Sequence, residues 1–195
     1  MVGYGEFSDA IVPVAVAQEL VHIAMLIHDD VIDQDTVRHG SDNISGIYLK
    51  RYAHHLDSTQ GLHYAYGASI LAGDALLSEA YKLMYEAHLP PHITQQLVSR
   101  LHRSIYEVIG GEVMDVETPI LKTLTNPLDI YRYKTASYSF IGPILSGAYC
   151  AGANQETLST LELFGHYVGI GFQLQDDLLG VFGNETATGK STITA

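Results

Sequence analysis

Three aspartates stand close together at the end of an apolar stretch, in LIHDDVID at residues 26–33. Asp29 and Asp33 are four residues apart, so a helix would put both carboxylates on one face, with Asp30 about 100° further around. Carboxylates crowded at a helix C-terminus repel one another and oppose the helix dipole, so a cation is the natural compensation. Oxygen ligands that leave coordination sites for substrate phosphate suit Mg²⁺. The segment therefore predicts a magnesium site, with a solvated acidic helix end as the alternative.

A second acidic pair lies in GFQLQDDLLG at residues 171–180. Asp176 and Asp177 come three and four residues after Gln173, so a helix would project the amide and both carboxylates toward nearly the same side. Charged groups buried without partners among the surrounding apolar residues would cost several kcal/mol. We therefore expect a metal ion or a ligand here, with a surface turn carrying a chance pair as the alternative.

Three basic residues have the chemistry to hold a phosphate group beside these aspartates. Arg38 offers a planar fork of donors, whereas Lys134 and Lys190 offer point charges. A lone basic residue on a mostly acidic chain is more often simply solvated, and this is the alternative for each of them. The sequence shows no Ser-His-Asp or Cys-His arrangement of the kind that nucleophilic catalysis uses.

These side chains must be positioned by helices. Apolar residues recur at three- and four-residue spacing through nearly the whole chain, with almost no strict alternation, so the predicted class is all-α. Turn residues separate the helices, including HGSD at 39–42, LPP at 89–91 and TNP at 125–127. The predicted helices run over residues 12–33, 62–88, 93–117, 128–152 and 156–181.

Composition and charge narrow the classes of protein. The chain has 195 residues, 47% hydrophobic and 16% charged, which predicts a single domain over residues 1–195 with a large core. The net charge of −12 disfavours nucleic acid as a partner. Cys150 is the only cysteine in the sequence, which fits a reducing compartment. Gln18, Glu19 and His22 interrupt the apolar stretch 11–27, so we expect no integral membrane segment and a cytoplasmic protein.

Taken in order, these and other motifs resemble those of the trans-isoprenyl diphosphate synthase family, over nearly the whole chain. ELVH at 19–22 is similar to the segment whose histidine contacts isopentenyl diphosphate, DDVID at 29–33 to the first aspartate-rich motif, DDxxD, and RHG at 38–40 to the Arg-Arg-Gly that follows it. GDALL at 73–77 resembles GDxLL, GGEVMD at 110–115 resembles GGQxxD, YKTA at 133–136 matches the Lys-Thr motif, and FQLQDD at 172–177 matches the second aspartate-rich motif. Each motif is weak alone, but their order and spacing make the set specific.

The resemblance implies an isoprenoid synthase-type helical bundle with a central cavity, here truncated at both ends. It implies a Mg²⁺-dependent trans-prenyltransferase that condenses isopentenyl diphosphate with an allylic diphosphate, as a homodimer with up to three metal ions bound. The implied metal ligands and catalytic carboxylates are Asp29, Asp30, Asp33, Asp176 and Asp177, with Asp30 and Asp177 in supporting roles. The implied substrate-binding residues are His22, Arg38, His39, Lys134, Thr135, Gln173 and Lys190, and Lys134 is also implied to be catalytic.

The chain departs from the family pattern at several positions. His39 takes the place of the second arginine, Glu112 that of the glutamine in GGQxxD, and Gly180 that of a third aspartate, so residue 180 cannot be a ligand. The Gly-Gly-Lys-x-x-Arg-Pro segment near the start of relatives, and the helices that follow their second aspartate-rich motif, are missing from the sequence. We therefore expect either part of a longer protein or a shortened member with impaired turnover.

The resemblance to the family also bears on the length of the product and on alternative functions. Ala24 and Met25, with Val21 a turn earlier, place no aromatic block before Asp29, which favours a product of C20 (geranylgeranyl) or longer. One alternative is a non-catalytic or truncated subunit of a heteromeric prenyl synthase. A class I terpene cyclase shares the fold, but residues 173–180 do not resemble the Asn/Asp-x-x-x-Ser/Thr-x-x-x-Glu motif that cyclases usually carry. His22 equally fits a core histidine.

Overall fold

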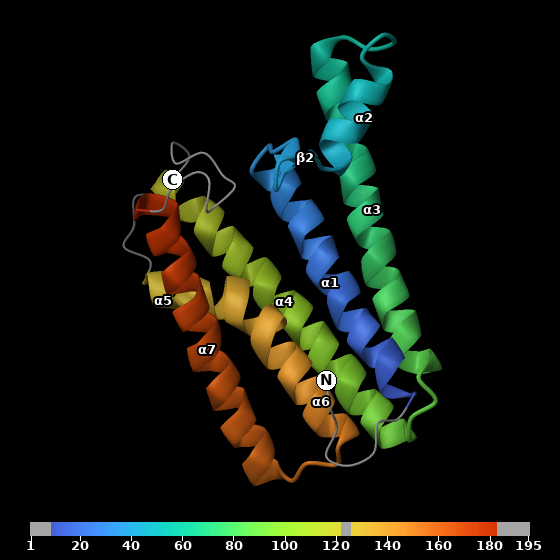
Figure 1. Ribbon diagram of the computed structural model, residues 1–195, viewed down its shortest axis with the longest axis vertical. Coiled ribbons are helices and arrows are strands. Elements are labelled where there is room, and N and C mark those ends of the chain that lie inside the picture. Colours follow the sequence, from blue (N-terminus) through green and yellow to red (C-terminus); the bar gives the residue numbers. More distant parts are fainter. Residues whose placement is uncertain (1–8, 122–125, 183–195) are drawn as a thin grey trace. The chain divides into compact units, whose positions relative to one another are not determined.

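Helices make up nearly all of the part of the chain that the computed structural model describes, residues 9–121 and 126–182 (Figure 1). This confirms the all-α class, and each of the five predicted helical segments begins and ends within four residues of its predicted bounds. The helices are α1 (Ile11–Ile32), α2 (Ile44–Tyr52), α3 (Ser58–Glu86), α4 (Pro91–Leu121), α5 (Pro127–Ile130), the π-helix η1 (Tyr131–Ile141), α6 (Gly142–Cys150) and α7 (Gln155–Phe182), and the strands are β1 (Val37–Arg38) and β2 (Ser41–Asp42).

The predicted helix 128–152 is three consecutive elements with a π-helix in the middle. Asn126 caps α5 by accepting a hydrogen bond from the Leu128 N–H, with Pro127 in the first turn. At the end of η1 the N–H of Gly142 bonds to the carbonyl of Ser137, five residues back, and Pro143 lies in the first turn of α6, which begins at Gly142. Proline has no N–H for the four-residue bond of an α-helix, which favours a switch of hydrogen bonding at this point. Since π-helices are frequent at functional sites, η1 marks the segment that carries Lys134 and Thr135.

A small antiparallel hairpin follows α1, where the sequence indicated only a turn. Arg38 pairs with Ser41, and His39 and Gly40 form the two-residue turn between the strands. Both turn residues have positive φ, 51° and 74°, which is the pattern of a tight type I′ turn. The hairpin directs β1 back toward the last turn of α1 and so positions Arg38.

The chain divides into two compact units, which are described separately. In the described residues, unit 1 comprises residues 9–18, 81–121 and 126–177, and unit 2 comprises residues 19–80 and 178–182. The sequence analysis predicted a single domain over residues 1–195, and this stays a prediction.

The helices of unit 1 pack closely through glycines. α4 lies beside η1 and α6 (Figure 1), and a Cβ added at Gly111 would lie 2.7 Å from the Cα of Lys134. On α7, a Cβ at Gly169 would lie 2.6 Å from the Cα of Ala136 on η1. Gly111 therefore lets α4, and Gly169 lets α7, approach the backbone of the π-helix closely.

The α4–η1 contact gives a test with a matched control. Gly111→Ala is expected to lower the free energy of unfolding by about 1–3 kcal/mol, because the methyl group has no room against the η1 backbone. Gly110→Ala on the same helix meets no atom within 4 Å, and alanine improves helix propensity there by about 1 kcal/mol. Urea unfolding followed by circular dichroism measures both, and equal stabilities of the two variants would refute the close packing.

α1 is the candidate for a membrane span among the described helices. Its 18-residue window has a mean hydropathy of 1.7 and is 39% buried, so length and composition alone would permit a span. A core helix passes the same test, and Val14, Ala17, Val21 and Ala24, at most 1% exposed, follow helical spacing. The buried stripe favours a core helix, and the absence of an integral membrane segment stays a prediction.

Candidate functional site

The acidic end of α1, in unit 2, is held by the guanidinium of Arg38. Arg38 Nε donates to Asp30 Oδ1 at 2.8 Å and Nη2 donates to Asp29 Oδ2 at 2.8 Å. Asp30 is 4% exposed, so its charge would be costly without this partner. Burial opposes the charge of Arg38, but hydrogen bonds to Asp30 and Asp29 and their negative charges outweigh it and raise the pKa of Arg38. The two aspartates therefore converge on one permanent cation.

The remaining predicted residues of this unit lie along the same segment. The N–H of Asp33 still bonds to the Asp29 carbonyl at 2.8 Å, so the four-residue relation between these aspartates is helical, as predicted. Asp33 is exposed, as is His39 at the hairpin tip, and His22 is half-buried on α1. The structure thus brings Asp29, Asp30 and Arg38 into direct contact.

In unit 1, Lys134 on η1 lies between two carboxylates of α4. Lys134 Nζ is 2.6 Å from Asp115 Oδ2 and 3.1 Å from Glu112 Oε2. Glu112, which departs from the family glutamine, therefore serves as a partner of the lysine. About a quarter of the Lys134 side chain stays exposed, so the ammonium can still reach a ligand.

A chain of hydrogen bonds connects η1 to the acidic pair of α7. Thr135 Oγ1 donates to Gln173 Oε1 at 2.7 Å, and Gln173 Nε2 donates to Asp177 Oδ1 at 2.9 Å. The hydroxyl of Tyr131 donates to the other oxygen of Asp177. The side chain of Asp176 makes no hydrogen bond or ion pair with the residues that the structure describes, and it is exposed. The two aspartates thus differ, because Asp177 is held by protein donors and Asp176 is available to a ligand.

Tyr131 is a site residue that the sequence analysis missed. It lies three residues before Lys134, a spacing that would put both on one side of a regular α-helix, but its partner Asp177 is 46 residues away. The hydrogen bond to Asp177 is the main cause that raises the pKa of Tyr131 to about 12, with burial and the charges of Asp177 and Asp115 adding to it. The phenol therefore remains a hydrogen-bond donor at neutral pH.

This pKa predicts a difference in alkaline titration. Because the folded protein holds the Tyr131 proton more tightly than the free side chain does, the phenol should stay protonated above pH 10 and ionise near pH 12. Asp177→Asn removes the acceptor charge and should bring ionisation back toward pH 10. Carbon-13 NMR of labelled tyrosine, assigned with Tyr131→Phe, checks this at about pH 10.5. Equal ionisation of Tyr131 in wild type and Asp177→Asn would contradict the assigned contact.

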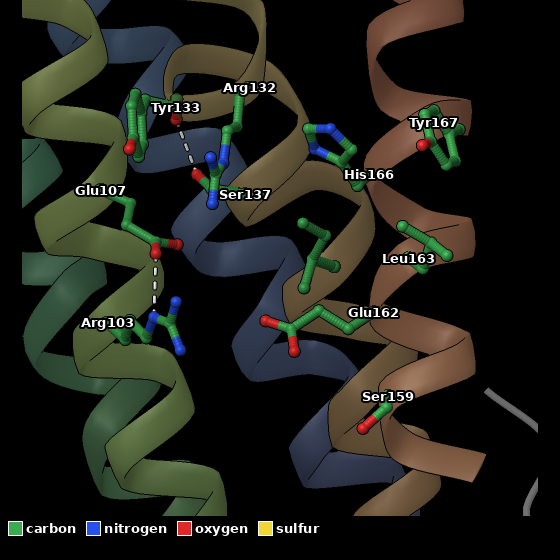
Figure 2. Close-up of a pocket in the computed structure, with 11 residues that line it drawn as sticks. Arg103, Glu107, Arg132, Tyr133, Ser137, Ser159, Glu162, Leu163, His166 and Tyr167 are labelled. Carbon is green, nitrogen blue, oxygen red and sulfur yellow. Dashed lines mark hydrogen bonds and ion pairs between the residues drawn. The ribbon is translucent and has the colours of Figure 1, made fainter. Parts of the chain in front are cut away.

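A groove of about 370 Å³ in unit 1 lies apart from these contacts (Figure 2). Arg103 and Glu107 on α4, joined by a hydrogen bond of 2.9 Å, form one wall, and Glu162 and His166 on α7 form another. The floor comes from η1, where Ser137 Oγ donates to the Tyr133 carbonyl at 2.6 Å. None of the predicted site residues lines this groove.

The acidic residues suit a metal ion whose remaining coordination positions are filled by a ligand such as phosphate. In the described ranges, no three His, Cys, Asp or Glu side chains are grouped closely enough to hold an ion by themselves. Mg²⁺ commonly takes one or two carboxylates and fills its other positions with water and substrate phosphate. In unit 2, Asp29 and Asp30 already converge on a cation, and in unit 1, Asp176 is exposed, so the carboxylates of each unit, taken separately, fit this mode of binding. Lys190 lies outside the described residues.

Known proteins match this chain over nearly its whole length. The family model described as Polyprenyl synthetase matches residues 3–194. The chain is 30% identical to the geranylgeranyl diphosphate synthase of Methanosarcina mazei, covering 93% of this chain and 51% of that protein. It is 34% identical to heptaprenyl diphosphate synthase component 2 of Geobacillus stearothermophilus, covering 91% of this chain and 49% of that protein.

A solved structure agrees with the fold. Geranylgeranyl pyrophosphate synthase of Corynebacterium glutamicum, crystallised with isoprenyl diphosphate and magnesium, is 31% identical with a TM-score of 0.86. The alignment covers 95% of this chain and 53% of that chain. The helical fold is therefore that of the matched synthases, and the chain spans about half the length of these relatives.

Proposed function

Because the chain belongs to the polyprenyl synthetase family, we propose that it carries the metal-binding and diphosphate-binding part of a trans-prenyltransferase. The reaction joins isopentenyl diphosphate to an allylic diphosphate and releases pyrophosphate. The observation that carries the proposal is the pairing of acidic and basic motifs, with Asp29 and Asp30 on Arg38 and with Asp115 and Glu112 on Lys134. A bound diphosphate needs cationic side chains to compensate its negative charge. The same side chains compensate the charge of the carboxylates when no metal ion is bound.

The barrier in this chemistry is charge separation, because the allylic carbon–oxygen bond breaks to give a carbocation and pyrophosphate. Bound Mg²⁺ would supply Lewis acidity toward the leaving pyrophosphate. We assign direct metal ligation to Asp29 and Asp33 in unit 2 and, separately, to Asp176 in unit 1. Asp30 and Asp177 hold the arrangement, since each is engaged by protein donors.

The basic and polar residues act on the diphosphate itself. In unit 2, Arg38 would donate to diphosphate oxygens, with its fork able to reach two at once, and in unit 1, Lys134 would donate to diphosphate oxygens as a point charge. Thr135 and Gln173, which share a hydrogen bond in unit 1, would orient the diphosphate that Lys134 binds. After the isopentenyl double bond attacks the cation, the released pyrophosphate can accept the proton that leaves, so the chain needs no further base.

We propose C20 or longer for the product and a homodimer in the cytoplasm for the whole protein. Val21, Ala24 and Met25, before Asp29, are all buried and none is aromatic. These side chains would leave room for a growing prenyl chain, whereas a bulky aromatic residue at one of these positions would block it. The relative named heptaprenyl diphosphate synthase component 2 favours a second candidate, a subunit of a heteromeric synthase.

A product assay tests the proposal. The chain is incubated with labelled isopentenyl diphosphate, an allylic diphosphate and Mg²⁺, and the dephosphorylated products are separated by chromatography. Prenyl products that end at one length and vanish with EDTA support the synthase. A chain that gives no product alone or with the rest of a family member supplied as a second polypeptide would refute catalysis.

A further inference from the structure

The ring of His28 occupies a notch on α3 that exists because residue 73 is glycine. A Cβ at position 73 would lie 2.6 Å from His28 Cδ2 and 2.9 Å from Cε1, and closer still to Nε2. Real Cβ atoms do not approach ring atoms so closely, because packed interiors leave no room for such overlap. Any side chain at residue 73 would therefore displace the histidine.

Polar contacts fix the ring in this notch. His28 Nε2 lies 3.3 Å from the carbonyl oxygen of Ile70, one turn before Gly73, to which its N–H can donate. The same nitrogen lies 3.7 Å from Asp74 Oδ1. About a quarter of the side chain is exposed, so most of the ring is enclosed. Steric and polar contacts thus hold His28 against α3 on more than one side.

The contact of His28 with α3 matters because of the residues that follow His28 in the sequence. His28 comes directly before Asp29, on the turn of α1 that also carries Asp30. One residue of helix corresponds to about 100° of rotation, so a small rotation of this turn redirects both carboxylates. Arg38 contacts these aspartates from β1, and His28 seats the same turn against α3. The residues in contact here, 28–38 and 70–74, all belong to unit 2.

We propose that His28 and Gly73 form a positioning pair that sets the direction of Asp29 and Asp30 for metal and diphosphate. The proposal rests on the proposed function, because it assigns those carboxylates to a metal site. His28 is a positioning residue, which acts through the aspartates and touches no reacting atom. Chemistry at the site then depends on a glycine on α3.

Four variants of the chain test the pair. They are His28→Ala, Gly73→Ala, the double variant His28→Ala/Gly73→Ala, and the control Gly67→Ala, which lies on α3 with no atom within 4 Å of its added Cβ. The first readout is the affinity for inorganic pyrophosphate in excess Mg²⁺, measured by isothermal titration calorimetry. The second is the melting temperature, measured by circular dichroism, which identifies variants that simply fail to fold.

The expected result is non-additive. Gly73→Ala should weaken pyrophosphate binding about tenfold and His28→Ala about threefold, whereas the double variant should match His28→Ala, because the clash needs the ring. Gly67→Ala should bind as wild type does. Folded variants with unchanged affinity, or a double variant that loses the product of both single effects, would overturn the positioning pair alone. A wild-type chain that binds no pyrophosphate in Mg²⁺ would overturn the proposed function and, with it, the pair.

Discussion

Asp29→Asn is expected to lower prenyl transfer by about 10²–10³-fold, the effect of removing one preorganised electrostatic contact from a transition state. Asparagine keeps the shape of the side chain and can still accept the 2.8 Å hydrogen bond from Arg38. It lacks the negative charge that a metal ligand needs. The loss should therefore appear in kcat and in the Mg²⁺ requirement, measured in the product assay, and the melting temperature should change little.

The control for this variant is another acidic residue. Glu86→Gln removes one negative charge at an exposed position at the end of α3. It should leave activity within about twofold, as expected for a surface change away from any special feature. Asp29→Asn with more than a third of wild-type activity would show that Asp29 is not a metal ligand.

Lys134→Ala is expected to reduce kcat/KM for the allylic diphosphate by at least about 10²-fold. Lys134 Nζ is 2.6 Å from Asp115 and 3.1 Å from Glu112, so its removal leaves two carboxylates facing the diphosphate without a cation. Their repulsion should raise KM, and the loss of a donor to the leaving group should lower kcat. Steady-state kinetics at saturating isopentenyl diphosphate separates these effects.

Two further variants show whether the charge of Lys134 is the cause. Glu112→Gln on the Lys134→Ala background removes one of the two carboxylates and should recover part of the lost affinity. Lys50→Ala removes an exposed lysine that is also paired with an aspartate, Asp42, and should leave the kinetics unchanged. A Lys134→Ala variant no weaker than Lys50→Ala would refute a role for Lys134 in diphosphate binding.

The sequence predicted the helices, and which candidate carboxylates share a helix face, because both depend on local spacing. Asp29 and Asp33 are one helical turn apart, and the structure retains that relation through the Asp33–Asp29 backbone bond. Gln173 and Asp177 likewise show the four-residue contact that their spacing predicts. The family motifs added the order in which these local pairs occur, and the matches over residues 3–194 confirm the family.

The remaining features depend on packing between distant segments. The switch to π-type hydrogen bonding in η1 lies inside a segment whose apolar spacing is ordinary for an α-helix. Tyr131 bonds to a residue 46 positions away, and His28 fits beside a glycine 45 positions away only because α1 and α3 meet there. No local pattern of residue types records such contacts, since each depends on which helices become neighbours and how they are rotated.

The most direct test of the central claim is metal-dependent binding of a diphosphate to this chain. Isothermal titration calorimetry compares inorganic pyrophosphate in excess Mg²⁺ and in EDTA, for wild type and for Asp29→Asn. The account predicts binding by wild type in Mg²⁺, none in EDTA, and at least about tenfold weaker binding by Asp29→Asn, which corresponds to about 1.4 kcal/mol. Equal binding with and without Mg²⁺, or equal binding by the two proteins, would contradict a metal site built on the first aspartate cluster.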